Sequence, residues 1–329
     1  GILLRLTIVG AILAVTSAIA KDRKQIVEDA VDSWEGYKKK HGKQYLTVEA
    51  ESAHLEAFID AFIRVHEHNQ KIDASFKMAI NKHSDYTAMD WKERRCVHVD
   101  DSHTGVPILK TSEGFQAPDA VDWRKEEAVT RVKDQGYCGS CWAFAAVGAL
   151  EGSHAIASKQ LLELSEQQLV DCFSSDGCHG DSTNAAFDYV TKNGGIDTED
   201  SYPYEAAQGS CRYNPNTIGS QAKGYEQVEV GNETALELAI AEKGPVSIYI
   251  QFSYAWSHYA GGVLDDPECV HDQLHAVTLV GYDTDPQFGQ YWIVKNSWGE
   301  GYGEDGYIRM SRNKNNQCGI ADYAYHVIV

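Results

Sequence analysis

Cys141 is the residue whose surroundings point most directly to chemistry. It precedes the apolar run 142–151, so the sequence predicts a thiol at the N-terminus of a helix, with Ser140 as the side-chain cap. The positive end of the helix dipole and the unpaired N–H groups of the first turn stabilise a thiolate. Because the thiolate is the nucleophilic form of cysteine, the pattern predicts a reactive thiol.

Cys138 and Cys141 also form a C-x-x-C pair, which is found in zinc sites and in redox dithiols. A zinc site would need a second ligand pair, and neither a second C-x-x-C nor an H-x3-H follows at the spacing of a zinc finger. A thioredoxin-like motif would lie in a short chain of βαβ units, which this sequence does not show. We therefore expect neither a metal nor a cofactor.

The whole stretch 135–144, Gln-Gly-Tyr-Cys-Gly-Ser-Cys-Trp-Ala-Phe, resembles the active-site motif of papain-like cysteine proteases. The signature C-G-[SA]-C-[WY] of that family is accompanied by a histidine and an asparagine far downstream. His275 and Asn296 stand at matching places, and Asn296 opens the sequence Asn-Ser-Trp-Gly. The resemblance implies a cysteine endopeptidase in which a Cys141 thiolate attacks the peptide carbonyl and forms an acyl-enzyme.

The same resemblance assigns a role to each remaining site residue. His275 would be the counter-ion of the thiolate and would carry the proton to the leaving amine. Asn296 would hold the orientation of the imidazole ring, and Trp298 would shield their hydrogen bond from water. Gln135 would complete the oxyanion hole together with the backbone N–H of Cys141. Donors of this kind contribute roughly 3 to 4 kcal/mol of transition-state stabilisation.

Composition restricts the class of protein. The chain of 329 residues, with 43% hydrophobic and 10% aromatic residues, is long enough for more than one globular core. Its net charge of -19 opposes binding to nucleic acids and to anionic membrane surfaces, because both reward clustered Lys and Arg. Eight cysteines indicate an oxidising compartment.

The first residues are typical of a secretory signal peptide. Arg5 precedes the apolar run 6–19, and the pattern Ala-Ile-Ala at 18–20 is typical of a cleavage site. A membrane anchor is the alternative, but the apolar run is shorter than the roughly 18 residues that argue for a membrane span. We expect a signal peptide over 1–20, incomplete at its N-terminus, and a protein of the secretory pathway that is either lysosomal or extracellular.

Residues 21–116 are expected to form a pro-region whose helical part covers about 27–89. The periodicity of 48–69 predicts an amphipathic helix. This part resembles the inhibitory pro-region of cathepsin L-like zymogens. Two segments carry the likeness. In the first, the helix pattern of the family is E-x3-R-x3-F-x2-N-x3-I-x3-N. Phe58 and Asn69 match this pattern, and Val65 is a conservative substitution. Three positions differ from it: Ala50, His54 and Ala61. In the second, the family pattern is G-x-N-x-F-x-D. Asn81 and Asp85 match it, whereas Ala79 replaces the glycine and His83 replaces the phenylalanine.

The resemblance implies a zymogen, and we expect its activation at acid pH. The pro-region would inhibit in cis, and its extended segment 94–116 would run through the active-site cleft in the direction opposite to a substrate.

Residues 117–329 resemble the mature catalytic domain of the same family. Up to about 202 they are helical in pattern, with a capping box beginning at Ser165 and a helix that ends at Gly194. The later half alternates like strands, for example at 246–250 and 291–295. The fold class is therefore expected to be α+β: a helical lobe and an antiparallel, barrel-like lobe, preceded by a helical pro-domain.

Six cysteines remain in the catalytic domain besides Cys141, and they allow 15 pairings. The resemblance implies the pairs Cys138 with Cys178, Cys172 with Cys211, and Cys269 with Cys318. Cys96, in the pro-region, has no evident partner and is expected to be a free thiol or to form an intermolecular bridge. Asn232 begins the only sequon and is a candidate for one surface glycan.

The chain departs from the family where substrate would bind. Gly180 and Asp181 stand where relatives have two glycines and where substrate backbone would pair, and Tyr323 falls at the floor of a specificity pocket. We expect peptide and protein substrates, cystatin-like inhibitors and a monomer. His179, His258 and His271 lack such support and are expected at the surface or in packing. A catalytically silent binding protein of the same fold is the alternative function.

Overall fold

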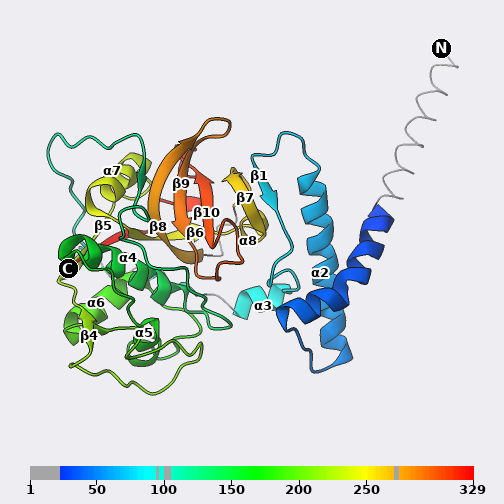
Figure 1. Ribbon diagram of the computed structural model, residues 1–329, viewed down its shortest axis with the longest axis horizontal. Coiled ribbons are helices and arrows are strands. Elements are labelled where there is room, and N and C mark those ends of the chain that lie inside the picture. The colour runs from blue at the N-terminus through cyan, green and yellow to red at the C-terminus, as the bar shows by residue number, and fades with distance from the viewer. Residues whose placement is uncertain (1–22, 94–95, 100–104, 270–273) are drawn as a thin grey trace, which may run out of the picture. The chain divides into compact units, whose positions relative to one another are not determined.

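The computed structural model describes residues 23–93, 96–99, 105–269 and 274–329 (Figure 1). The chain divides into two compact units, Gly1–Asp90 and Trp91–Val329. The signal peptide predicted over 1–20 lies outside the described residues, as does His271. Within the described ranges, every helix is too short or too polar to cross a lipid bilayer.

The first unit is helical, as predicted for the pro-region. Residues 23–41 form a helix, and α2 (Val48–Asn69) follows it. Thr47 caps α2, because its side chain accepts a hydrogen bond from the N–H of Ala50 at 3.1 Å. An aromatic core joins the two helices: the ring of Phe58 lies 5.2 Å from that of Trp34 and 4.5 Å from that of Tyr37. The helix pattern therefore forms despite its departures from the family.

Asp85 is the polar centre of this unit. The side chain is buried, and its carboxylate accepts hydrogen bonds from Tyr37 Oη at 2.7 Å, Tyr45 Oη at 2.6 Å and Lys43 Nζ at 2.7 Å. His54, which stands where the family pattern has arginine, reaches the backbone carbonyl of Asp85 through Nδ1 at 2.8 Å. Lys43 thus supplies the cation that pairs with this buried carboxylate.

Asn69 fastens the end of α2 to the strand β1 (Phe76–Met78). Its side-chain amide donates to the carbonyl of Met78 at 2.7 Å and accepts from the N–H of the same residue at 3.0 Å. Both hydrogen-bonding groups of one strand residue are satisfied in this way. The short helix α3 (Ala88–Glu93) then leads into the second unit.

The helical part of the second unit is built around α4 (Cys141–Ser158), which is buried over most of its length. The N-cap of α5 (Glu166–Cys172) is Ser165, whose Oγ accepts from the N–H of Gln168 at 3.0 Å. The expected capping box is only half formed, because the side chain of Gln168 instead accepts from the N–H of Asp197 at 2.7 Å. α6 (Thr183–Asn193) ends at Gly194, which adopts a left-handed φ of 82°.

The later half of the second unit forms a sheet, with strands in the order β7, β10, β9, β8, β6, β11, β5 and with β2 paired to β8. Neighbouring strands are antiparallel except β7 and β10, which are parallel, so the expected sheet is antiparallel only in its main part. The strand bounds are β2 Val121–Asp122, β5 Gly224–Gln227, β6 Val246–Gln251, β7 Tyr259–Leu264, β8 Leu274–Asp285, β9 Gly289–Lys295, β10 Tyr307–Ser311 and β11 Ala324–Ile328.

Shorter elements complete the unit. β3 (Ile196–Asp197) pairs with β4 (Ile218–Ser220), and α8 (Tyr254–Ser257) precedes β7. The N-cap of α7 (Glu233–Lys243) is Asn232, whose Oδ1 accepts from the N–H of Ala235 at 3.0 Å. A 3-10 turn, η1 (Gln317–Gly319), precedes β11.

Two features of this α+β architecture position the predicted site residues. His275 is the second residue of β8, and Asn296 directly follows β9, the antiparallel neighbour of β8. α4 packs against β8 at Gly148, where a Cβ atom would collide with the side chain of Thr278. This close approach brings the N-terminus of α4 to the beginning of β8.

Candidate active site

Cys141 lies at the N-terminus of α4 and is fully buried. The prediction that Ser140 caps this helix through its side chain is wrong. Ser140 Oγ instead makes a 2.6 Å hydrogen bond to Tyr204 Oη, and only its carbonyl joins the helix, accepting from the N–H of Ala143 at 2.9 Å. The N–H of Ala276 donates to Cys141 Sγ at 3.2 Å. The sulfur thus lies at the positive end of the helix dipole and within reach of a backbone donor.

His275 is buried and oriented by Asn296. Its Nε2 lies 2.8 Å from Asn296 Oδ1, which also accepts from the N–H of Ser297 at 2.8 Å and is thereby held in one orientation. Because an amide oxygen only accepts, Nε2 carries a hydrogen and Nδ1 is free to take a proton. A ring nitrogen of His275 and the sulfur atoms of Cys141 and Cys96 lie within 4.8 Å of one another.

Aromatic rings enclose the imidazole. The rings of Trp298 and Trp256 lie 5.1 Å and 5.2 Å from that of His275, and Trp298 is only 7% exposed. Burial lowers the pKa of His275 to about 4, and the hydrogen bond to Asn296 opposes that shift. Trp256 was not identified from the sequence, because it lies outside the local motifs and reaches the site only through the position of α8.

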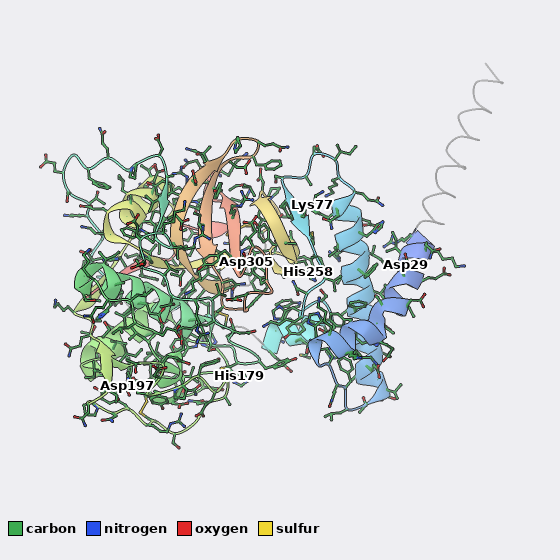
Figure 2. The ribbon with its side chains drawn as sticks, viewed as in Figure 1. Asp29, Lys77, His179, Asp197, His258 and Asp305 are labelled. Carbon is green, nitrogen blue, oxygen red and sulfur yellow. A yellow bond between two sulfur atoms is a disulfide. The ribbon has the colours of Figure 1, made fainter. Side chains whose placement is uncertain are left out.

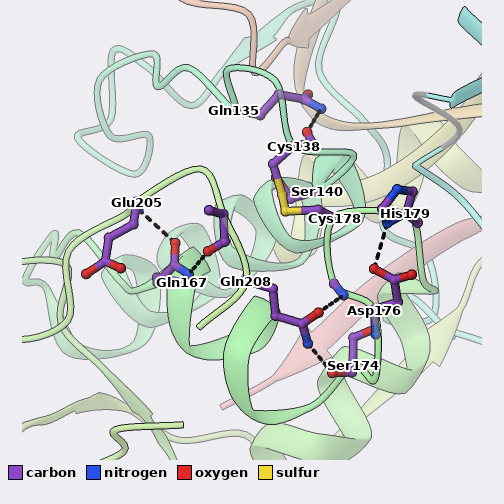
Figure 3. Close-up of a disulfide and its surroundings, with 12 residues drawn as sticks. Gln135, Cys138, Ser140, Gln167, Ser174, Asp176, Cys178, His179, Glu205 and Gln208 are labelled. Atoms are coloured by element: carbon purple, nitrogen blue, oxygen red, sulfur yellow. Dashed lines mark hydrogen bonds and ion pairs between the residues drawn. A yellow bond between two sulfur atoms is a disulfide. The ribbon is translucent and has the colours of Figure 1, made fainter. Parts of the chain in front are cut away.

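Gln135 is held on both sides of its amide. Its Nε2 donates to the carbonyl of Cys138 at 3.0 Å (Figure 3). Its Oε1 accepts from Ser297 Oγ at 2.7 Å. The disulfide between Cys138 and Cys178 anchors the chain just after Gln135, next to the start of α4 (Figure 3). One N–H of Gln135 Nε2 is left over from the bond to Cys138, and the fixed amide can direct it at a developing oxyanion.

Cys96 does not occupy the state expected from the sequence. The structure joins Cys138 to Cys178, Cys172 to Cys211 and Cys269 to Cys318, the same three pairs that the resemblance implied. The expectation that Cys96 is free or pairs with another chain is wrong, because the structure joins it to Cys141. No local signal announces this pair, since the two residues meet only when the extended segment lies along the catalytic unit.

The extended segment after α3 pairs with the candidate substrate-binding residues. Val97 forms a parallel backbone bridge with Asp181, and the N–H of His98 donates to the carbonyl of Asp181 at 3.1 Å. Gly180 adopts a φ of 100°, a conformation that favours glycine at this turn. Tyr323 packs against Tyr249 with ring centroids 5.5 Å apart.

The histidines without catalytic support behave as predicted (Figure 2). The side chain of His179 is 67% exposed and pairs with Asp176 at 2.6 Å. His258 is buried, where Nδ1 bonds to Ser257 Oγ at 2.9 Å and the ring stacks on Tyr254. The first is therefore a surface residue and the second a packing residue.

A buried ionic cluster lies beneath the site and was not found from the sequence. Lys133 Nζ contacts Glu151 at 2.8 Å and Glu166 at 2.7 Å. Lys295 donates to Thr130 Oγ1 at 2.9 Å. The two lysines and the two glutamates line a cavity of about 20 Å³ between α4 and β8, large enough for about one water molecule. They come from separate stretches of the chain, so no motif could have signalled the cluster.

The two carboxyl groups in this cluster differ in protonation. Burial raises the pKa of Glu166 to about 7, against the partial opposition of Lys133. For Glu151 burial acts in the same sense, but the charges of Lys133 and Lys295 outweigh it and lower the pKa. The cluster therefore holds one firm carboxylate and one carboxyl group that takes up a proton on mild acidification.

We expect Glu166→Gln to remove a component of acid stabilisation. Because the pKa of Glu166 is higher in the folded than in the unfolded state, its contribution is complete below about pH 4.3 and is lost as the pH rises through 7. Acidification from pH 7.5 to 5 should stabilise the wild type relative to the variant by about 1 to 3 kcal/mol. Denaturant midpoints at both pH values measure this.

The comparison between the two proteins is necessary because His275 and His326 act in the opposite direction. Burial lowers the pKa of each to about 4, so their contribution is lost as the pH falls from 6.5. Both histidines are present in the wild type and in the variant, so their contributions cancel in the difference between the two proteins. An identical pH dependence of the two midpoints would contradict the assignment to Glu166.

A thiol at a helix N-terminus, a histidine oriented by an amide and a fixed amide donor, set between a helical part and a sheet, define a thiol peptidase of the papain type. Residues 117–328 match the model of the papain family cysteine protease, and residues 34–91 match that of the cathepsin propeptide inhibitor domain (I29). The chain belongs to the papain family of cysteine proteases. It is a cathepsin L-like cysteine endopeptidase made as a zymogen, with its pro-region as an intramolecular inhibitor.

Relatives of known name support this assignment over nearly the whole chain. A protein named cathepsin L-like from Caenorhabditis elegans is 43% identical over 98% of both chains. Digestive cysteine proteinase 2 of Homarus americanus is 42% identical over 91% of this chain and 95% of its own. The solved structure of digestive procathepsin L2 from the larval midgut of Tenebrio molitor matches with a TM-score of 0.83 and 36% identity, covering 91% of this chain and all of that one.

Proposed function

We propose that Cys141 is the nucleophile of this endopeptidase, with His275, Asn296 and Gln135 as its catalytic partners. The observation that carries the proposal is the convergence of Cys141 Sγ and a ring nitrogen of His275 within 4.8 Å. The hydrogen bond from His275 Nε2 to Asn296 Oδ1, 2.8 Å long, leaves Nδ1 on the side of the Cys96–Cys141 disulfide, 3.4 Å from Cys96 Sγ. Proton transfer between a thiol and its base needs this orientation.

The reaction follows from these positions. The thiolate of Cys141 attacks the carbonyl carbon, and the oxyanion takes hydrogen bonds from Gln135 Nε2 and from the backbone N–H of Cys141. His275 gives its proton to the leaving amine and then removes a proton from the water that hydrolyses the acyl-enzyme. Trp298 and Trp256 shield the imidazole from solvent, so that its hydrogen bond to Asn296 survives throughout.

The side of the site that receives substrate is proposed to include Gly180, Asp181 and Tyr323. The pro-region segment pairs with the backbone of Asp181, which supports backbone pairing of Asp181 with a substrate strand that runs in the opposite direction. Tyr323 is partly buried beside Tyr249 and offers bulk without charge to a substrate side chain. A panel of fluorogenic peptides tests this, because Tyr323→Ala should then change the preferred side chain.

We also propose how the zymogen is processed. A signal peptide over 1–20 would direct the chain to the secretory pathway and so to a lysosomal or extracellular destination. Removal of the pro-region, 21–116, at acid pH would leave the catalytic domain 117–329 as a monomer. Asn232 would carry a glycan, since its Nδ2 makes a hydrogen bond only to Glu229 at 2.8 Å among the bonds described. Cystatin-like proteins would be its inhibitors.

Covalent labelling tests the proposed function. After treatment with a reducing agent at acid pH, the protein should react with an epoxide or vinyl-sulfone probe at Cys141, because these reagents need an activated thiolate. Peptide mapping locates the label, and iodoacetamide after denaturation verifies that the thiol is present. If Cys141 is alkylated in the denatured protein but is never labelled in the folded protein, the chain is the silent binding protein and not an enzyme.

A further inference from the structure

Cys96 and Cys141 form a disulfide inside the second unit. Their Cα atoms lie 5.5 Å apart, within the range that a disulfide requires. All eight cysteines are among the described residues, and the other six form the three remaining pairs. Cys141 therefore has one available partner in the chain, which is Cys96.

Contacts on the upstream side hold Cys96 in place. The ring of Trp91 lies 6.0 Å from that of Trp298 and 5.4 Å from that of Phe252. Trp298 is one of the two indoles against His275. The chain is therefore anchored upstream of Cys96 by the packing of Trp91 against aromatic residues of the active site.

Backbone pairing holds the downstream side. Val97, the next residue, forms the bridge to Asp181. Farther along, the carbonyl of Pro107 accepts from the N–H of Gln227 at 2.9 Å, and the N–H of Leu109 donates to the carbonyl of Gln227 at 2.8 Å. Because both sides are anchored, Cys96 Sγ is presented to Cys141 at a high effective concentration, and pairing within the chain is favoured over pairing between chains.

We propose that the Cys96–Cys141 disulfide is a redox latch, so that the zymogen becomes an active peptidase only after a thiol reductant has released Cys141. The inference rests on the proposed role of Cys141 as nucleophile. It adds a second condition for activation to the acid pH that loosens the pro-region.

Formation of the latch needs an external disulfide RSSR, such as a small disulfide or a thiol-disulfide oxidoreductase of the secretory pathway. The Cys141 thiolate attacks one sulfur of RSSR, and the S–S bond breaks with release of RS⁻. The Cys96 thiolate then attacks Cys141 Sγ in this mixed disulfide and releases the second RS⁻. Two protein thiols are oxidised to one disulfide, and RSSR is reduced to two thiols.

Release reverses the electron flow. A reductant thiolate attacks Cys96 Sγ, and the electron pair of the broken S–S bond stays on Cys141 Sγ. This sulfur is the better leaving group, because the N-terminus of α4 stabilises its thiolate. A second thiolate attacks the sulfur bound to Cys96, RSSR departs, and Cys96 takes up a proton. Two reductant thiols are oxidised, and His275 regains an anionic partner.

Burial makes the two conditions interdependent. Cys96 is 3% exposed and Cys141 is fully buried, so a reductant reaches neither sulfur while the segment is in place. His275 Nδ1 lies 3.4 Å from Cys96 Sγ, a sulfur that carries no charge in the disulfide. Acidification must first loosen the segment, and reduction must then free the nucleophile. The chain thus stays inactive in an acidic but oxidising compartment.

Mass spectrometry of the full-length zymogen provides the direct test. The protein is secreted into oxidising medium, alkylated in acid without reductant and digested. We expect a peptide that contains Cys96 linked to one that contains Cys141, and we expect the zymogen of Cys141→Ser to be alkylated at Cys96. Recovery of both cysteines alkylated in the untreated wild-type zymogen would overturn the proposal, and this result does not depend on any variant or on activity.

Kinetics of activation provide the second test. At acid pH without reductant, Cys96→Ser should develop peptidase activity at least about tenfold faster than the wild type, whereas added glutathione should make the two rates equal. Equal rates without reductant would refute the latch. If the epoxide or vinyl-sulfone probe labels Cys141 in neither protein, even with glutathione, the proposed catalytic role fails. In that case the peptide map still decides whether the disulfide exists.

Discussion

Cys141→Ser is expected to lower kcat/KM for peptide hydrolysis by about 10⁴-fold or more. A serine hydroxyl is not ionised at the end of a helix as a thiol is, so His275 would have no anionic partner and the nucleophile would be lost. Removal of a nucleophile from a comparable constellation leaves only the residual catalysis by the oxyanion hole and by substrate binding. The measurement is hydrolysis of a fluorogenic peptide after removal of the pro-region by an added protease, in the presence of a thiol reductant that frees Cys141 in the wild type.

The variant should keep its fold. Serine is close in size to cysteine, and three disulfides remain in the catalytic unit. Near-ultraviolet circular dichroism and the thermal midpoint check this. Cys96→Ser is the matched control, because it removes the same disulfide without touching the nucleophile, and its processed form should have wild-type kcat/KM. Wild-type turnover by Cys141→Ser would refute the assignment of the nucleophile.

Asp85→Ala is expected to destabilise the pro-region by about 3 to 5 kcal/mol, because removal of one partner of a buried ion pair leaves the other uncompensated. The side chain of Lys43 is only 6% exposed, and Tyr37 and Tyr45 also lose their acceptor. A loss of that size is comparable to the whole stability of a small domain. Hydrogen exchange of the full-length chain should therefore show loss of protection over α2 and the helix at 23–41.

The control for this change is Asp60→Ala. Asp60 also lies in the pro-region and pairs with Arg64 at 2.8 Å, but both side chains are more than half exposed, and such pairs contribute little. Both changes are made in the Cys141→Ser background, in which the chain cannot process itself. If the two variants lose protection equally, Asp85 is not the polar centre of the pro-region.

Local patterns were informative wherever a function depends on neighbours in the chain. The stretch around Cys141 and the stretch after Asn296 each carry a motif, and the periodicity of 48–69 predicted the helix α2. Helices and strands follow from such patterns because side-chain spacing decides which face is buried. Ser140 shows the limit of this reasoning: its position at the N-cap was correct, yet the partner of its hydroxyl, Tyr204, comes from a distant loop.

The residues that the sequence alone singled out are those with a recognisable type at a recognisable spacing: the proposed nucleophile, its two proposed distant partners and the six cysteines paired by resemblance. Only the tertiary structure decided the partner of Cys96, the indole of Trp256 beside His275, and the shared cation of Glu151 and Glu166. Each of these depends on segments that are far apart in the chain and that meet through packing. Such contacts are set by the sum of many buried interactions, and no short stretch of sequence records that sum.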